Sequence, residues 1–318
     1  MGPLLWTALG IAVIAALIYA LLCVLLVFKF LHRQPLTYRF PDSYVGTPNE
    51  KYIPRIGRDL DWYPAAAKED VFTESVDGLK LHAVLVPADG PARGTIILCH
   101  GFHSSAQWDF SCALKSLHDK GFQLLVIDQR AHGESEGRFL TMGVMERMDI
   151  RNWAVWMLVH FGETHPVILE GMSMGAASVL MAANVGLPVN VKGLISDCGF
   201  TCPREIFLSV MRSIHIPRFF LWGAAIACRC IAGFDIDGAD TRKALAESDL
   251  PLLMVHGESD SFVPCYMSQQ GFAAAKSADK RLITVPGAEH GMSFVVDEPT
   301  VSAALDDFYD RVCPKILP

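Results

Sequence analysis

The segment Gly171–Gly175 reads Gly-Met-Ser-Met-Gly and lies between an apolar run and a run of small residues. The apolar run, Val167–Leu169, predicts a short buried strand, and the small residues that follow favour a helix. In a G-x-S-x-G turn of this kind the serine occupies a tight, strained bend, and the glycines let the backbone approach its neighbours. Ser173 is therefore the candidate nucleophile.

A serine hydroxyl needs a histidine to take its proton and usually a carboxylate to orient that histidine. Asp260 lies a few residues past the apolar run Leu252–Val255, in a loop before a helix that Pro264 would begin. His290 follows the next apolar run in the same manner. We expect Asp260 to be the acid and His290 the base, because both would lie in loops at the same carboxyl edge of a sheet. The chain order Ser, Asp, His also differs from the orders of the chymotrypsin and subtilisin architectures.

Backbone amides are also needed to stabilise the oxyanion of a tetrahedral intermediate. The amide of Met174 is the first candidate, since it opens the helix after the serine. The second is the amide of Phe102, which follows His100 and Gly101 directly after an apolar strand. We expect the Phe102 side chain to line the pocket.

Other residues compete for these roles. Asp197, after the apolar run Val191–Ile195, is an alternative acid, because the carboxylate can also follow the strand before. Among the other histidines, His100 suits backbone ordering better than proton transfer, and His256 marks a strand end. Ser173 itself could serve only as a helix cap.

Apolar runs recur after residue 70, and most of the gaps between them are long enough for a helix. Two strand-like stretches joined at Asp77-Gly78 predict an antiparallel hairpin at the start. The later alternation predicts an α/β fold, a mostly parallel central sheet with helices on both faces. The expected strands are 70–74, 79–86, 95–99, 123–127, 167–169, 191–195, 252–255 and 282–285.

Local signals also predict helices. Ser104 or Ser105 can cap a helix that ends at Lys120, and an apolar stripe from Ile150 to Phe161 predicts a core-facing helix. A last helix over Val301–Val312 closes the domain.

More than fifty residues, rich in Phe, Leu, Ile, Ala and Trp, separate the strand ending near Ile195 from the one starting near Leu252. A crossover connection needs only about a dozen residues, so we expect a helical cap at about 200–246. An ordinary crossover helix is the alternative. A second membrane span over Phe219–Ala232 is disfavoured, because Arg229 interrupts it.

Near the N-terminus, Leu4–Phe28 are 25 residues without a formal charge, more than the roughly 20 that a membrane-spanning helix needs. A cleaved signal peptide is the alternative, but no Lys or Arg precedes the run and no A-x-A-like site follows it. Lys29, Arg33 and Arg39 follow the run, so the positive-inside tendency places the large C-terminal part in the cytoplasm. We therefore expect a single-pass N-terminal anchor.

The chain would then divide into a transmembrane anchor (1–30), a juxtamembrane connector (31–69) and a catalytic domain (70–318) that carries the cap. Its 318 residues, 51% hydrophobic and 19% charged, can bury a large core. A formal net charge of −7 without clustered Lys or Arg argues against a nucleic-acid partner.

The nine cysteines are odd in number and scattered, and several lie in apolar runs, which favours a compartment where thiols stay reduced. The pairs Cys198/Cys202 and Cys228/Cys230 lack a second pair or a matching histidine spacing. Buried small hydrophobic side chains are therefore favoured over a metal site.

From about Asp70 to Val312 the chain resembles the α/β-hydrolase superfamily. Within it, the chain is most similar to the membrane-anchored Bem46-like hydrolases and to bacterial lysophospholipase, esterase or serine aminopeptidase-like relatives. The resemblance rests on the His100-Gly101 loop, the Asp128–Ser135 segment, the Gly171–Gly175 turn, the Asp260 loop and the His290 loop, in that order.

This resemblance implies that Asp128, Arg130 and His132 are structural supports rather than catalytic groups. The sequence predicts a membrane-anchored serine hydrolase that cleaves a lipid-like acyl ester through an acyl-enzyme, with no metal or organic cofactor. A peptidase, a thioesterase or a protein deacylase could use the same triad. A membrane-tethered binding protein with a degenerate site is the alternative from another class.

Overall fold

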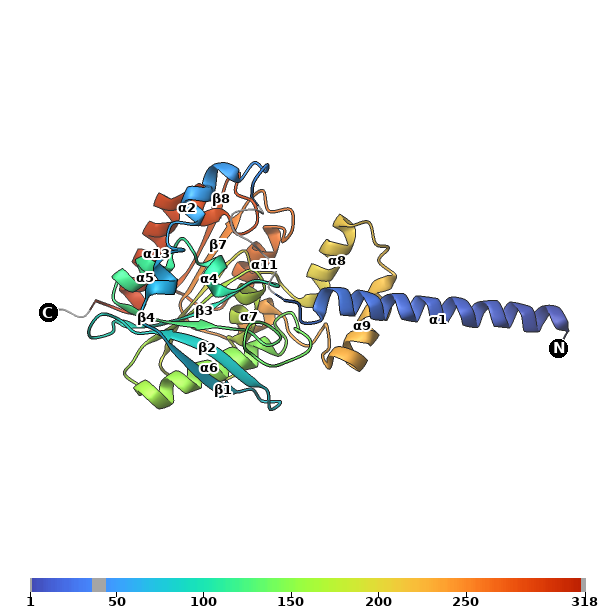
Figure 1. The fold of residues 1–318 in the computed structure, drawn as a ribbon. Helices are drawn as coiled ribbons and strands as arrows, with labels where there is room; N and C mark the ends of the chain where they lie inside the picture. Colours follow the sequence, from blue (N-terminus) through green and yellow to red (C-terminus); the bar gives the residue numbers. More distant parts are fainter. Residues whose placement is uncertain (1, 36–43, 316–318) are drawn as a thin grey trace.

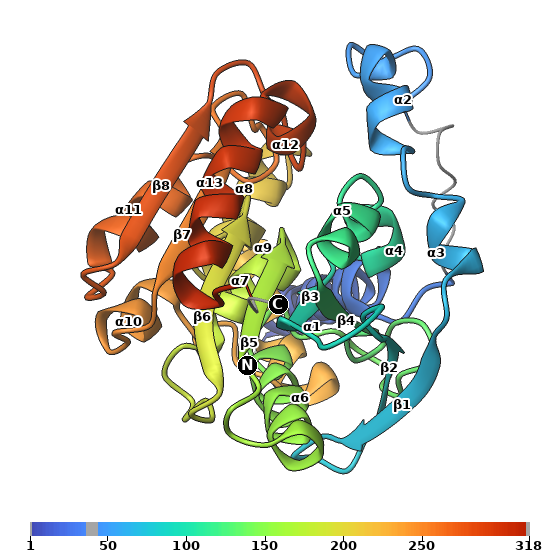
Figure 2. The ribbon, with the colours of Figure 1, turned by 90° about the vertical axis from the view of Figure 1, so that its left-hand side faces the viewer.

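An eight-stranded sheet forms the centre of the computed structural model, which describes residues 2–35 and 44–315. Arg39, one of the residues used to predict orientation, lies outside these ranges. The strand order is β1-β2-β4-β3-β5-β6-β7-β8, with β2 antiparallel to β1 and β4 and the other neighbours parallel (Figure 1 and Figure 2). The strands are β1 (Glu69–Glu74), β2 (Lys80–Val86), β3 (Gly94–Cys99), β4 (Phe122–Ile127), β5 (Val167–Met172), β6 (Val191–Asp197), β7 (Leu252–Gly257) and β8 (Lys280–Val285).

Helices cover both faces of the sheet, as the alternation of apolar runs predicts (Figure 2). Strands β3 and β4 are buried along their whole length, which explains their continuous apolar runs. One face packs against α4 (Ala106–Asp109), α5 (Leu114–Asp119), α12 (Ser293–Val296) and α13 (Glu298–Val312). The other packs against α6 (Glu146–Phe161), α7 (Met174–Ala182), α10 (Thr241–Ala246) and α11 (Tyr266–Ala274).

The single helix expected between Ser104 and Lys120 is instead the two short helices α4 and α5. Ser105 occupies the N-cap of α4, but its side chain makes no capping hydrogen bond. Phe110 is buried in the core between the helices, and the Ser111 hydroxyl donates to the Ile56 carbonyl at 2.7 Å. These tertiary contacts interrupt a helix that local signals alone would continue.

The segment expected as a connector carries structure of its own. It contains η1 (Glu50–Tyr52), α2 (Ile53–Ile56) and α3 (Trp62–Ala65). Ile56 and Tyr63 belong to the same hydrophobic core as α5 and α13. Residues 44–66 are therefore packed against the α/β domain and do not form an extended linker.

Between β6 and α10 the chain forms the helices α8 (Pro203–Ser213) and α9 (Phe220–Ala227), followed by a π-helical segment η2 (Cys228–Ala232). Figure 1 shows α8 and α9 beside the N-terminal helix, away from the sheet. Leu245 of α10 belongs to the core under the sheet, so α10 is a layer helix. The cap helices end before it, short of the expected boundary at about 246.

The N-terminal helix α1 (Pro3–Leu31) projects from the domain (Figure 1). Among the described residues it is the one helix long and apolar enough to cross a membrane. Its last turns, however, bury Cys23, Val27 and Leu31. The Leu31 carbonyl accepts the Leu140 amide at 3.0 Å, and the Arg33 guanidinium donates to the Ser135 carbonyl. The end of α1 is thus part of the domain.

Candidate active site

The turn between β5 and α7 holds Ser173 in a conformation that few residues adopt. Its φ is +54° and its ψ is −114°, in the left-handed half of backbone space, and α7 begins at the next residue. A side chain at Gly175 would collide with the Cys99 carbonyl of β3, and one at Gly171 with the backbone of Gly175. The glycines are thus required by close backbone contacts, which present the serine at the end of the sheet.

The structure brings the three predicted residues together. The Ser173 Oγ lies 2.9 Å from the Nε2 of His290, and the Nδ1 of His290 lies 2.6 Å from the Oδ2 of Asp260. The residues follow β5, β8 and β7 at the carboxyl ends of parallel strands, which meet at one edge of the sheet. Serine, imidazole and carboxylate therefore form one hydrogen-bonded chain.

The carboxylate of Asp260 is held on both oxygens. Its Oδ1 accepts the amides of Phe262 and Val263, at 3.0 and 2.8 Å. Burial favours its neutral form, but hydrogen bonds from His256 and His290 and the Val263 amide outweigh burial and bring the pKa of Asp260 to about 2. The group is ionised at neutral pH and can orient His290.

His256 contributes more than the end of a strand. Its Nε2 lies 2.8 Å from the Val263 carbonyl and 3.2 Å from the Oδ2 of Asp260, while its Nδ1 contacts the Ser268 hydroxyl at 2.7 Å. The ring is fully buried and braces the Asp260 loop. In the sequence, only the position of His256 four residues before Asp260 indicates this contact.

Asp197, the alternative acid, ends β6 close to these groups. Within the described residues, the ring of His290 forms hydrogen bonds with Asp260 and Ser173, and Asp197 takes part in neither. Burial raises the pKa of Asp197 to about 6, and its Oδ1 is enclosed without a hydrogen-bond partner among those residues. Its backbone carbonyl accepts the Ser173 amide at 2.9 Å, so Asp197 helps to hold the turn that carries Ser173.

Phe102 lies in the loop after β3, beside Ser173, and Met174 is the first residue of α7. The first amides of a helix have no acceptor within it, which leaves the Met174 amide available. The loop is fixed by Asp109, whose Oδ2 accepts the Gly101 amide at 2.6 Å and whose Oδ1 accepts the Ser104 hydroxyl at 2.6 Å. Asp109 was not among the predicted site residues, because no local sequence pattern indicates its contacts with this loop.

His100 and His132 support the same loop rather than Ser173. His100 contacts the Gly101 carbonyl through Nδ1, at 2.8 Å, and its Nε2 accepts the Gln129 amide, at 3.1 Å. Burial lowers the pKa of His132 to about 3, so the ring is neutral and its Nε2 accepts the His103 amide at 3.2 Å. These contacts agree with the structural roles expected for both residues.

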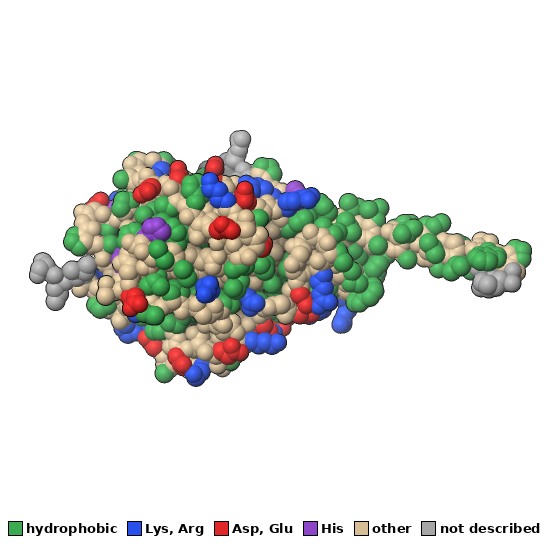
Figure 3. All heavy atoms as spheres, turned by 90° about the horizontal axis from the view of Figure 1, so that it is seen from below, with side chains coloured by type: hydrophobic (Ala, Val, Ile, Leu, Met, Phe, Trp, Pro, Cys, Tyr) green, Lys and Arg blue, Asp and Glu red, His purple; other side chains and the backbone are tan. Residues whose placement is uncertain are grey.

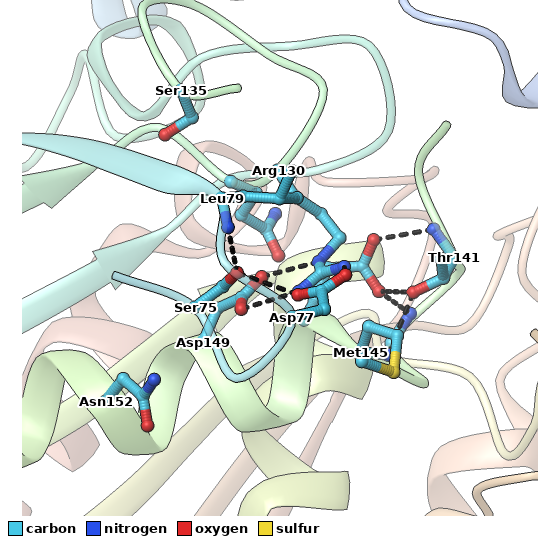
Figure 4. Close-up of polar contacts among 12 residues, drawn as sticks. Ser75, Asp77, Leu79, Arg130, Ser135, Thr141, Met145, Asp149 and Asn152 are labelled. Carbon is cyan, nitrogen blue, oxygen red and sulfur yellow. Dashed lines mark hydrogen bonds and ion pairs between the residues drawn. The ribbon is translucent and has the colours of Figure 1, made fainter. Parts of the chain in front are cut away.

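Arg130 ties the segment after β4 to α6 and to the β1–β2 turn (Figure 4). Its guanidinium is buried and donates to both oxygens of Asp149, at 2.6 and 2.7 Å, and to both oxygens of Asp77, at 3.0 Å. Asp128 accepts the Glu134 amide and contacts the His82 ring. Both therefore occupy supporting positions.

Among the residues that the structure describes, one group of side chains lies close enough together to hold a metal ion. The ligand atoms of Cys198, Asp260 and His290 lie within 4.8 Å of one another. Burial holds the pKa of the Cys198 thiol well above its ordinary value, and a thiol must ionise to bind a metal. Asp260 and His290 are already bonded to each other, so the donor set suits a proton relay better than a metal.

Two cavities meet at Ser173. One, of about 140 Å³, is lined almost entirely by apolar side chains, and α1, α8 and α9 contribute many of them. The other, of about 280 Å³, includes polar groups such as His290, Asp109 and Ser104. Phe102 lines both cavities, as expected of its side chain. The serine thus faces an apolar and a more polar space.

The sheet, the serine turn and the serine–histidine–carboxylate chain define an α/β-hydrolase. Residues 90–217 and 220–295 match the family model described as Serine aminopeptidase, S33. The chain belongs to that family, and its relatives support a hydrolase of the esterase type.

Relatives and solved structures agree with this assignment. The chain is 24% identical to caffeoylshikimate esterase of Arabidopsis thaliana, over 89% of this chain and 94% of that one. It is 26% identical to YqkD of Bacillus subtilis, over 72% and 74%. The fold is similar to that of the Pyrococcus furiosus esterase Pf2001, with a TM-score of 0.63, 20% identity and coverage of 80% and 94%.

Proposed function

We propose that the protein is a membrane-anchored serine esterase in which Ser173, His290 and Asp260 form the catalytic triad. The observation that carries the proposal is the unbroken hydrogen-bond chain from the Ser173 hydroxyl through His290 to Asp260. Each group has the neighbour that its role requires.

In the proposed reaction, the Ser173 Oγ attacks the ester carbonyl carbon while the Nε2 of His290 takes the hydroxyl proton. Asp260 holds the ring through Nδ1 and stabilises its positive charge. His290 then protonates the departing alcohol as the ester C–O bond breaks, which leaves an acyl-serine. Water, deprotonated by His290, then adds to the acyl carbon. The bond between this carbon and Oγ breaks as His290 returns the proton to Oγ, which releases the carboxylic acid and free Ser173.

The amides of Phe102 and Met174 are the proposed oxyanion donors. Both border Ser173, and the contacts of Asp109 and His132 fix the loop that carries Phe102. Preorganised donors of this kind lower the barrier because they need no rearrangement when charge develops. None of these steps calls for a metal or an organic cofactor.

An acyl ester is the proposed substrate class. The esterase relatives and the apolar cavity beside Ser173 support it. The name of the family model points to amide substrates as a second candidate. The same nucleophile could also act on thioesters.

A fluorophosphonate probe and a substrate panel test the function. Wild-type protein in detergent should be labelled and Ser173→Ala should not, with unchanged thermal unfolding of the variant as the control. The panel comprises p-nitrophenyl esters of increasing acyl length, a lysophospholipid, a monoacylglycerol and aminoacyl amides. Absence of labelling favours a binding protein, and turnover of amides without any ester would overturn the esterase proposal.

The anchor and orientation form part of the same proposal. The exposed apolar side chains in the first turns of α1 support a membrane anchor within residues 1–30, with the region from 70 onward as the catalytic domain. Lys29 and Arg33 follow the apolar run and favour a cytoplasmic catalytic domain. Protease added to intact cells should leave the domain undigested until the membrane is opened, and digestion in sealed cells would reverse the orientation.

A further inference from the structure

The last turns of α1 form a wall of the apolar cavity at Ser173. Leu26, Val27, Phe30 and Leu31 line this cavity together with residues of the cap and the sheet edge. Val27 and Leu31 are 3% and 2% exposed and belong to one core cluster with side chains of α8, α9 and α7. A helix that served only as a membrane anchor would not need to line a cavity at Ser173.

This wall is fixed to the catalytic machinery. The Phe30 carbonyl lies 2.9 Å from the Nε2 of His103, the residue that follows Phe102 in the loop after β3. Burial lowers the pKa of His103, which favours its neutral ring as the donor in this contact. The end of α1 therefore has a defined position relative to Ser173.

The same helix places the cap against the bilayer. From Pro3 to Leu22, α1 has 20 residues, which span roughly 30 Å, the thickness of a bilayer's hydrocarbon core. Contact with α9 begins near the end of this stretch, where the Tyr19 hydroxyl donates to the Phe219 carbonyl at 2.9 Å and accepts the Gly223 amide at 3.1 Å. The cap thus meets α1 where the helix would leave the membrane.

The outer face of the cap is apolar at this junction. Phe219, Trp222 and Ile226 are 58%, 70% and 45% exposed, and Arg229 lies exposed at the end of the patch. Figure 3 shows hydrophobic side chains along α1 and over the adjoining part of the body. Aromatic and basic side chains are typical of membrane interfaces. Because this patch continues the surface of a membrane-spanning helix, its occupant is the lipid bilayer.

We propose, on the basis of the proposed esterase function, that residues 26–31 of α1 determine acyl-chain specificity and that the substrate is an ester with one long acyl chain taken from the bilayer. The chain occupies the apolar cavity between α1 and the cap. The polar part of the ester occupies the second cavity, beside His290. One apolar and one polar space at Ser173 match a substrate with one apolar and one polar side.

The test compares two leucines that are adjacent in α1. Leu26 lines the cavity, whereas Leu25 is 53% exposed and does not line it. Full-length wild type, Leu26→Trp and Leu25→Trp are reconstituted in phosphatidylcholine vesicles, and kcat/KM is measured for p-nitrophenyl acetate and p-nitrophenyl laurate. For Leu26→Trp we expect the laurate-to-acetate ratio to fall roughly tenfold or more, since each methylene excluded from an apolar pocket costs about that factor. Leu25→Trp should keep the wild-type ratio.

Val27→Ala provides a second variant, because it removes side-chain volume from the same wall and should shift the preference towards longer chains. Fluorophosphonate labelling of Ser173 verifies that each variant keeps an assembled site. Unchanged chain-length profiles in both Leu26→Trp and Val27→Ala, with labelling intact, would overturn this inference and leave the esterase proposal standing. Failure of the wild type to be labelled or to cleave any ester would instead refute the proposed function.

Discussion

At the residue scale, the site depends on which carboxylate contacts His290. Asp197 ends β6 and Asp260 follows the neighbouring strand β7, and the charges of both carboxylates interact with that of His290. Only Asp260 combines a hydrogen bond to the His290 Nδ1 with two backbone amides on its other oxygen. Burial acts on both carboxyl groups, but hydrogen bonds bring the pKa of Asp260 to about 2, whereas burial raises the pKa of Asp197 to about 6.

Replacing each aspartate by asparagine should separate their roles. Asp260→Asn should lower kcat by about 10³–10⁴-fold, because the amide cannot hold the required tautomer of His290 or stabilise its charge. Asp197→Asn should change kcat by less than about tenfold, since its side chain makes no bond to His290. Steady-state kinetics with one p-nitrophenyl ester measures both, and equal losses in the two variants would contradict the assignment.

A second residue-scale prediction concerns Glu170, buried in β5, which accepts the Tyr309 hydroxyl at 2.8 Å. Burial raises its pKa from 4.5 to about 7. A carboxyl with a higher pKa in the folded state binds its proton more tightly when the protein is folded. The folded protein therefore loses stability as the pH rises from about 4.5 through 7 and Glu170 ionises. Glu170→Gln should therefore have a higher melting temperature than the wild type at pH 8 but not at pH 4.5. Each kcal/mol of stability corresponds to roughly 2–4 °C in melting temperature.

Thermal unfolding in detergent at the two pH values measures this difference. Glu163→Gln, on an exposed loop, is the matched control and should follow the wild type at both. A pH-independent difference between Glu170→Gln and wild type would show that ionisation of Glu170 is not the cause.

At the element scale, the loops at the carboxyl edge of the sheet are held by buried polar side chains. Arg130 joins the loop after β4 to α6 and to the turn between β1 and β2 (Figure 4). Asp109 fixes the loop after β3, and His256 braces the one after β7. Precise placement of Ser173, His290 and the proposed oxyanion donors thus depends on elements outside the proposed triad.

Arg130→Met should destabilise the fold by about 3–5 kcal/mol, because it leaves the buried carboxylate of Asp149 without its partner. Arg204→Gln breaks an ion pair with Asp237 in which both side chains are over 40% exposed, and should cost about 0–1 kcal/mol. Denaturant unfolding of the two variants in the same detergent measures the contrast. Similar small losses of stability in both variants would show that the ion pairs of Arg130 do not stabilise the fold.

At the scale of the whole molecule, α1 has two parts with different surroundings. The first turns expose apolar side chains, as a membrane span requires, whereas the last turns belong to a core cluster shared with the cap and α7. The exposed part can be removed without opening that core, but the buried part cannot.

Two truncations test this division. A chain lacking residues 2–22 keeps Cys23, Val27 and Leu31 and should stay folded in detergent. A chain lacking residues 2–33 uncovers the cap, and loses about 1.5–3 kcal/mol for each large apolar side chain removed from the core. Melting temperatures and size-exclusion profiles measure the difference. Equal stability of the two would mean that α1 is only a tether.

The sequence by itself determined the residue types, their order and the pattern of buried strands. Ser173, Asp260 and His290 could be chosen because each follows an apolar run, and parallel strands end at a common edge. A long run without formal charge also predicted α1, and the periodicity of apolar residues predicted α6, since both are local properties of the chain.

The tertiary structure decided which of these groups meet. The hydrogen bond of His290 to Asp260 rather than Asp197, the support by Asp109 and His256, and the break between α4 and α5 depend on strand order and on loops far apart in sequence. The wall that Leu26 and Val27 contribute to the Ser173 cavity depends on how α1 crosses the cap. Local patterns record burial, whereas convergence of distant side chains is set by packing of the whole chain.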